Sequence, residues 1–388
     1  MKILLTSLLL VSTACFSQQQ EAIDDELRES IIKIDVTVTD LFSRTETMPL
    51  VITTFRPPGE GKHPLLILNH GRSKESERHK PKRQRLWVQA RWFVEQGFVV
   101  MVPTRIGYGE TYSSFDPEFS NTCRGVNLRY KDDALFTQIM ATVEFSKTLS
   151  YVDSTAWLIA GQSLGGYTAI TIARRSPDGL LGAINFSGGY GGDPDNRNGN
   201  PCGAHAWEIE LKEKREERKI PTLWIYWKND WYWGNTIPQD WFKAYKSSGA
   251  IGDFFQLNEI NGDGHRGFSR DSKNWSQVVK PFIISISLQL HSVHLRKPKH
   301  SAPPSGFAKV NDINQIPFLN ENGRESYKTF LGKNQPKAFA INIDGKWGWS
   351  NGHWDSNDRA LNYCNNNAKS PCTLYAIDDD VVWINKTQ

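Results

Sequence analysis

The chain has 388 residues, of which 39% are hydrophobic and 23% charged, and its formal net charge at pH 7 is +4. This length predicts one large domain plus a smaller unit, and the apolar content is enough for a sizeable core. A net charge this weak for the chain's size excludes a strong electrostatic field for nucleic acid, so we expect no nucleic-acid partner.

The first residues have the pattern of a secretory signal peptide, which we place at residues 1–17. Lys2 precedes a short apolar run that ends in small residues. The run is too short to span a bilayer, and no other stretch has the pattern of a membrane span. We therefore expect an exported protein, periplasmic or secreted, with no integral membrane segment after signal removal. Two alternatives stay open: a buried N-terminal element, or cleavage after Ala14, which would leave Cys15 to carry a lipid anchor.

After the signal, strand and helix patterns alternate. Strands are predicted at 31–38, 50–55, 64–69, 98–103, 156–160, 180–186, 222–227 and 254–260, and helices at 86–96, 134–149, 164–175 and 274–290. The run at 64–69 is continuously apolar, which is typical of a strand buried on both faces of a parallel sheet. This alternation predicts a mostly parallel sheet with helices on both faces, whose active site lies at the carboxyl ends of the strands.

The pattern changes near residue 296. Residues 297–306 are rich in proline, serine and lysine, a composition typical of a linker. We therefore predict a catalytic domain at 25–296, a linker at 297–306 and a small C-terminal α+β module at 307–388.

Five cysteines occur, and removal of Cys15 with the signal leaves four. An even number in an exported chain suggests disulfides. We expect the pairs Cys123–Cys202 and Cys364–Cys372, because each pair would stay inside one proposed domain; four free thiols are the alternative. No CxxC motif or tight Cys/His cluster suggests zinc, and we predict neither a metal nor a cofactor.

A candidate nucleophile follows the predicted strand at 156–160. The segment from Gly161 to Gly165 matches G-x-S-x-G, in which a serine, here Ser163, lies on a sharp strand-to-helix turn. Glycines on both sides of the turn let neighbouring backbone pass without clashing. The alternative is an ordinary glycine-rich turn whose serine only caps the following helix.

A serine hydroxyl needs a base, and the base needs an orienting acid. His265 lies in a loop after the last predicted strand, whereas the other histidines lie in surface-like stretches or, for His70, at a position that is more often structural. Asp230 follows the strand at 222–227, between the nucleophile and the base in chain order. Asp263 competes for the role, but it is so close to His265 in sequence that we expect it to shape the turn.

Two backbone N–H groups are candidates for an oxyanion hole. One belongs to Leu164, directly after the nucleophile, and the other to Arg72, in the loop after the strand at 64–69. Arg105, Tyr108 and Trp231 are candidate substrate contacts, and Arg105 follows a predicted strand.

Together these segments resemble a known group of enzymes. The ordered set Asn69-His70-Gly71, Pro103 to Gly109, Gly161 to Gly166, Leu223 to Tyr226, Asn229-Asp230 and Asp263-Gly264-His265 is similar to exported bacterial hydrolases of the dienelactone-hydrolase-like branch of the α/β-hydrolase superfamily. The resemblance covers roughly residues 30–295. It implies an α/β-hydrolase fold and a triad of Ser163, Asp230 and His265. Dienelactone hydrolases proper use a cysteine nucleophile, so the serine favours ordinary carboxylic esters.

The leading hypothesis is therefore a serine hydrolase that cleaves a small-molecule or glycan-linked carboxylic ester through an acyl-enzyme. A peptidase of the prolyl-oligopeptidase type could use the same triad, but too few residues precede the hydrolase segment for the propeller of those relatives. A third hypothesis is a non-catalytic protein whose tryptophan-rich C-terminal part, with Trp347 and Trp349, binds glycan or cell wall. The alternative role for those tryptophans is the core of a small module.

Overall fold

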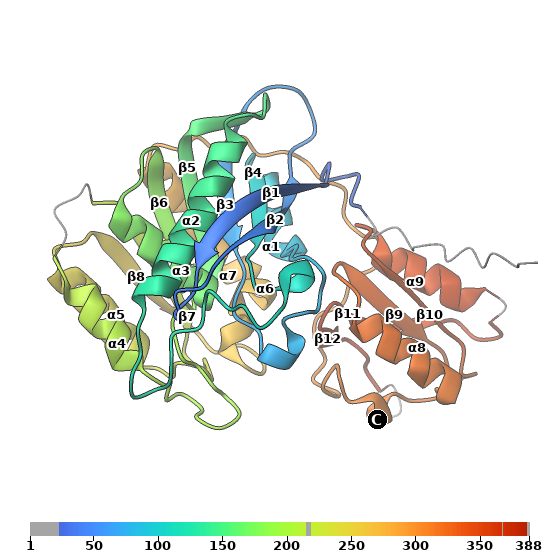
Figure 1. The fold of residues 1–388 in the computed structure, drawn as a ribbon. Helices are drawn as coiled ribbons and strands as arrows, with labels where there is room; N and C mark the ends of the chain where they lie inside the picture. The colour runs from blue at the N-terminus through green and yellow to red at the C-terminus, as the bar shows by residue number, and fades with distance from the viewer. Residues whose placement is uncertain (1–22, 215–218, 367, 386–388) are drawn as a thin grey trace, which may run out of the picture.

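The computed structural model describes residues 23–214, 219–366 and 368–385. The predicted signal peptide at residues 1–17, with Cys15, lies outside the described residues. Within them, no helix is both long and apolar enough to cross a membrane. Figure 1 shows two units, a large one built around a twisted sheet and a small C-terminal one with its own sheet.

The large sheet has eight strands in the order β1-β2-β4-β3-β5-β6-β7-β8. β1 and β2 pair with each other, and β2 with β4, in antiparallel fashion, whereas β4, β3, β5, β6, β7 and β8 are parallel. The strands are β1 (Ser30–Thr39), β2 (Thr45–Phe55), β3 (His63–Asn69), β4 (Val99–Thr104), β5 (Val152–Gln162), β6 (Leu180–Phe186), β7 (Thr222–Trp227) and β8 (Gly252–Leu257).

Helices cover both faces of this sheet. They are α1 (Trp87–Glu95), α2 (Arg129–Ser146), α3 (Leu164–Arg175), α4 (Ala204–Lys212), α5 (Ile237–Ser247), α6 (Gly267–Arg270) and α7 (Ser272–Ser285). Leu66 and Leu68 pack in one core with α1, α6 and α7, and Leu65 and Ile67 pack in the other with α2 and α3. Successive side chains of a strand point to opposite faces, so the continuous apolar run predicted at 64–69 fills both cores.

The helix predicted at 274–290 and the strand predicted at 254–260 end earlier than their patterns suggested. α7 ends at Ser285 rather than at residue 290, because Ser287 has a φ of 64° and turns the chain so that Leu288 packs in the core. β8 ends at Leu257 rather than at residue 260, since the N–H of Ile260 donates to the side-chain oxygen of Asn229 instead of to a strand.

The C-terminal unit has a four-stranded antiparallel sheet in the order β10-β9-β11-β12 and two helices. Its elements are α8 (Glu321–Leu331), β9 (Lys337–Ile341), β10 (Trp347–Asn351), α9 (Ser356–Asn365), β11 (Thr373–Ile377) and β12 (Asp380–Val381). Phe339, Tyr327 and Tyr375 form its core, against which Trp347 and Trp349 pack while staying half-buried. The small α+β module of the sequence analysis is therefore present.

The described residues contain two disulfides, one in each unit. Cys123 is bonded to Cys202, with 5.1 Å between their Cα atoms, and Cys364 is bonded to Cys372, with 6.0 Å between theirs. These are the pairs that the sequence analysis favours over free thiols.

Candidate active site

Ser163 lies at the sharp turn between β5 and α3. Its φ of 57° and ψ of −124° are strained for a residue with a side chain. A Cβ on Gly165 would lie 2.2 Å from the carbonyl oxygen of Asn69, and one on Gly161 would lie 2.4 Å from the backbone of Gly165. Only glycine fits at these two positions, and the turn has the geometry that the G-x-S-x-G pattern predicts.

Neighbouring elements hold this turn in place. The N–H of Ser163 donates to the carbonyl oxygen of Phe186 at 3.1 Å, and the Ser163 carbonyl accepts from Tyr167 at 3.0 Å and Gly189 at 3.3 Å. The loop after β3 lies on the other side, since a Cβ on Gly71 would be 3.1 Å from Ser163 Cβ and 3.6 Å from its Oγ. The serine is half-buried, so its hydroxyl lies in a shaped and partly open site.

His265 and Asp230 contact each other directly. His265 lies in a short 3-10 helix, Gly264–Arg266, and its Nδ1 is 3.1 Å from Oδ2 and 3.2 Å from Oδ1 of Asp230. Both side chains are buried. Because a carboxylate oxygen can only accept, Nδ1 must carry the hydrogen, which leaves Nε2 with the free lone pair that a general base needs.

The loop after β7 fixes the position of the acid. Oδ1 of Asp230 accepts backbone N–H groups from Tyr232 at 2.9 Å and from Trp233 at 3.2 Å. The competing acid, Asp263, accepts instead from the backbone of His265 at 2.9 Å and of Trp231 at 3.0 Å. Asp263 therefore shapes the turn, and Asp230 is the carboxylate that faces the imidazole.

Aromatic rings enclose the imidazole. The Tyr232 ring stacks on it, with 3.8 Å between ring centroids and 18° between planes, and Trp233 meets it edge-on at 5.5 Å. The side-chain amide of Gln162 donates to the carbonyl oxygen of His265, which ties the loop of His265 to the residue that precedes Ser163. Tyr232 was not identified from the sequence. Its place two residues after Asp230 is the sequence feature that could have indicated that it lies in the site.

His70 has a structural role, as its position suggested. Its Nε2 accepts the N–H of Arg105 at 3.1 Å, so Nδ1 carries the hydrogen and donates to the carbonyl oxygen of Gly71 at 2.7 Å. Burial, together with the nearby charge of Arg105, lowers the pKa of His70 well below its ordinary value. The ring is therefore neutral. Its two nitrogens bind the backbone of Arg105 and Gly71, which holds the loop that follows β3 in place.

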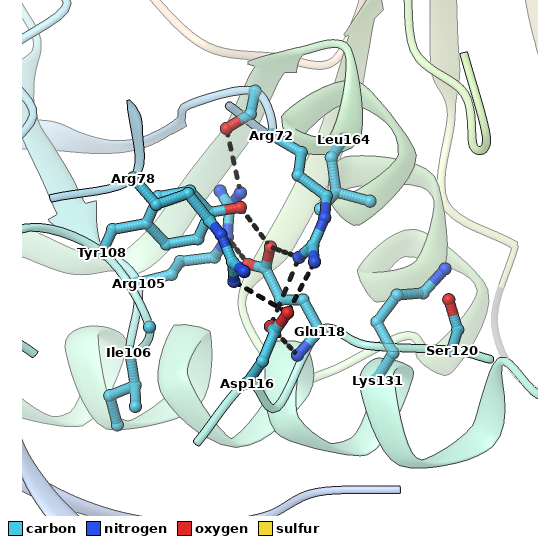
Figure 2. Close-up of polar contacts among 12 residues, drawn as sticks. Arg72, Arg78, Arg105, Ile106, Tyr108, Asp116, Glu118, Ser120, Lys131 and Leu164 are labelled. Atoms are coloured by element: carbon cyan, nitrogen blue, oxygen red, sulfur yellow. Dashed lines mark hydrogen bonds and ion pairs between the residues drawn. The ribbon is translucent and has the colours of Figure 1, made fainter. Parts of the chain in front are cut away.

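A network of charged side chains holds the same loop from below (Figure 2). Arg105 donates to the carbonyl oxygen of His70 at 2.7 Å and forms an ion pair with Glu118. Arg72 forms ion pairs with Asp116 at 2.6 Å and with Glu118 at 3.1 Å. The peptide groups around Gly71 are thus fixed on both sides, and this is the segment that carries the N–H of Arg72.

Glu118 is the centre of this network. Its carboxylate also accepts the hydroxyl of Tyr108 at 2.6 Å. Burial acts to raise the pKa of Glu118, but the guanidinium groups of Arg105 and Arg72 outweigh it and hold the pKa below its ordinary value. Sequence analysis did not identify Glu118, since it is brought to the site by a loop and no motif marks it.

The three candidate substrate contacts differ in exposure. Arg105 and Tyr108 are 0% and 1% exposed, and their polar groups are bound to Glu118. Trp231 exposes 44% of its surface. Of the three, only Trp231 is open to a ligand in this structure, while Arg105 and Tyr108 support the loop after β3.

Comparison with solved structures finds similarity at low identity. An acetyl xylan esterase from a Paenibacillus species is 13% identical with a TM-score of 0.43, covering 67% of this chain and 89% of its own. A Klebsiella pneumoniae chain with the provisional name dienelactone hydrolase is 13% identical with a TM-score of 0.44, covering 66% and 99%. An acylaminoacyl peptidase from Pyrococcus horikoshii is 13% identical with a TM-score of 0.44, covering 69% of this chain but only 42% of its own.

No family model matches the chain, and no curated protein matches its sequence. The sheet order, the helices on both faces and the strained turn after β5 nevertheless fit the α/β-hydrolase fold. The predicted fold class, with its small C-terminal α+β module, is confirmed.

Proposed function

We propose that this chain is a serine hydrolase that cleaves carboxylic esters through an acyl-enzyme. Ser163 attacks the acyl carbon while Nε2 of His265 takes the hydroxyl proton, and Asp230 stabilises the imidazolium that forms. The imidazolium then returns the proton to the leaving alcohol, and water releases the acid by the same route. The observation that carries the proposal is the buried bond between Asp230 and His265, whose loop accepts a hydrogen bond from Gln162, the residue before Ser163 in its strained, half-buried turn.

The negative charge of the tetrahedral intermediate needs two donors. We assign them to the backbone N–H groups of Leu164 and Arg72. Leu164 is the first residue of α3, so its N–H lies at the positive end of a helix. Arg72 belongs to the loop that lies against Ser163 and that His70 and Arg105 hold. Trp231 is the proposed contact for the substrate, because its ring is exposed beside Asp230.

Export is part of the proposal. Two disulfides, one in each unit, suit an oxidising compartment, which the predicted signal peptide would reach. The substrate would then be a small-molecule or glycan-linked ester outside the cytoplasm.

Active-site labelling tests the enzyme hypothesis. A fluorophosphonate probe should label the protein, and a Ser163→Ala variant should lose both labelling and hydrolysis of p-nitrophenyl acetate. Loss of a catalytic serine costs on the order of 10⁶-fold in kcat. Ser114→Ala, at an exposed serine in a loop, serves as the matched control, and circular dichroism checks that both variants fold. Labelling or hydrolysis that persists in Ser163→Ala would refute the proposal, and absence of labelling in the wild type would favour a binding protein.

A further inference from the structure

A large cleft lies between the hydrolase unit and the C-terminal unit. Its volume is about 780 Å³, and it is lined on one side by the loop before α1 and by α6, and on the other by the end of α8 and the residues after it. Gln162 and Arg266 also line it. These two residues are the sequence neighbours of Ser163 and His265, so the cleft lies next to the segments that carry the proposed nucleophile and base, although those two residues do not line it.

The exposed charges of the cleft are mostly positive. The cationic side chains open to it are those of Lys80, Arg266, Lys328 and Lys333, and the acidic ones are those of Glu77 and Asp379. Asp379 is already shared between Arg266 and Lys337, each at 3.6 Å. Lys80 and Lys333, on opposite units, have no ion-pair partner in the described part of the chain. Lys328 pairs with Glu325, and Glu77 has no ion-pair partner in the described residues, so the unpaired charges of the cleft are one lysine from each side against one carboxylate.

The remaining lining is polar rather than apolar. Gln84, Gln162 and Gln335 contribute amides, and Ser269 and Thr329 contribute hydroxyls. A ligand with hydroxyl groups can form hydrogen bonds with these amides and hydroxyls, whereas an alkyl chain cannot.

We propose that this cleft binds an acidic sugar, and that the ester substrate is attached to one. Carboxylates of the sugar would face Lys80 and Lys333, and its hydroxyls would bind the amides and hydroxyls of the lining. The inference rests on the proposed hydrolysis at Ser163 and specifies its substrate class. It also gives the C-terminal unit a role, because that unit supplies one wall of the cleft and one of the two unpaired cations.

Binding to an inactive full-length chain tests the inference. The Ser163→Ala variant is titrated calorimetrically with trigalacturonic acid and with the neutral trimer of galactose of the same linkage. The acidic trimer should bind at least tenfold more tightly. Adding Lys80→Glu and Lys333→Glu should weaken its binding by about tenfold and leave the neutral trimer unaffected, because each exchange replaces an attraction by a repulsion at an exposed site.

A matched control carries Lys62→Glu and Lys309→Glu, which make the same change in net charge at exposed lysines outside the cleft. Equal binding of the two trimers, no binding of either, or equal loss in the control would overturn the inference. Hydrolysis of p-nitrophenyl acetate by the Lys80→Glu/Lys333→Glu chain with Ser163 intact is measured in parallel. This small neutral ester does not need the cleft, so its turnover reports on the proposed catalysis alone.

Discussion

At the scale of single residues, the side chains around His265 bear on the proposed catalysis as directly as the histidine itself. One edge of the imidazole is bonded to Asp230, one face is covered by Tyr232, and Trp233 closes a further side. An aromatic face attracts a cation by about 0.5–2 kcal/mol, more strongly when water is excluded. The proposed reaction makes the imidazole a cation only in its transition states, so the stacked ring would stabilise those states selectively.

Tyr232→Leu should therefore lower kcat for p-nitrophenyl acetate by about threefold to thirtyfold, with little change in KM. Tyr232→Phe keeps the ring and should retain most of the activity. A role limited to packing would give similar losses in both variants, which steady-state kinetics would reveal.

A second residue, Lys131, links protonation to folding. Its ammonium is buried, 3.8 Å from the centre of the Tyr167 ring and 4.2 Å from that of Tyr190. Burial lowers the pKa of Lys131 to about 8. Between this pH and its ordinary value near 10.5 the unfolded chain binds one proton more than the folded chain. The free energy of unfolding therefore rises with pH across that window. Below about pH 8 Lys131 is charged in both states, and the folded wild type is destabilised by the full cost of burying the charge.

Lys131→Met should thus raise the free energy of unfolding at pH 7, by about 1–2 kcal/mol. A 1-unit shift corresponds to roughly 1.4 kcal/mol, and the loss of the contacts with the two rings and of the ion pair with Asp132 at 4.0 Å offsets part of the gain. The gain should shrink as the pH rises from 8 toward 10. Urea titrations at several pH values measure it, and a constant difference between the two proteins would contradict the expectation.

At the scale of elements, the loop after β3 depends on residues far from it in sequence. Glu118 binds Arg105, Arg72 and Tyr108, and Arg105 in turn holds the carbonyl oxygen of His70. Glu118→Gln would remove the charge that compensates two arginines and loosen the segment that carries the N–H of Arg72. Because one oxyanion-hole donor contributes about 10²–10³-fold in kcat, its displacement should cost about 10–10²-fold.

The loss should appear in kcat rather than in KM, and it should be accompanied by lower stability, since breaking a buried ion pair costs about 3–5 kcal/mol. Glu75→Gln, at an exposed position, is the control. A Glu118→Gln enzyme with unchanged kcat would show that the network does not position the oxyanion hole.

The sequence predicted the parallel strands well, because they depend on local pattern, and it selected Asp230 and His265, whose side chains contact each other in the structure. Thr222–Trp227 and Leu164–Arg175 were predicted with the bounds that the structure has. The helices α4 and α5 were not predicted, since their tryptophans Trp207 and Trp241 pack against each other and against β7 rather than forming an obvious helical stripe. Glu118 and Tyr232 were missed because their roles arise from contacts that only the folded chain creates.

At the scale of the whole molecule, the C-terminal unit is attached by specific contacts. Arg270 forms an ion pair with Asp380, and the guanidinium of Arg85 donates to the carbonyl oxygen of Gln335. The unit nevertheless has its own core and its own disulfide, between Cys364 and Cys372. Its folding and that of the hydrolase unit should therefore be separable.

Cys364→Ser/Cys372→Ser should lower the stability of the C-terminal unit by about 2–3 kcal/mol, because the disulfide closes a short loop. Hydrolysis of p-nitrophenyl acetate should not change, since the proposed triad lies in the other unit. Differential scanning calorimetry should show a shift confined to one transition, and a loss of esterase activity in the folded variant would argue against separate units.

The turn at Ser163 has a consequence for how this protein can change over time. A side chain held at a φ of 57° and ψ of −124° costs about 1–3 kcal/mol, which other parts of the fold must offset. Glycine would adopt the same angles without that cost. Selection for thermal stability alone would therefore favour glycine at this position, which would give a more stable chain without the proposed activity. Only selection for the proposed hydrolysis would retain the serine.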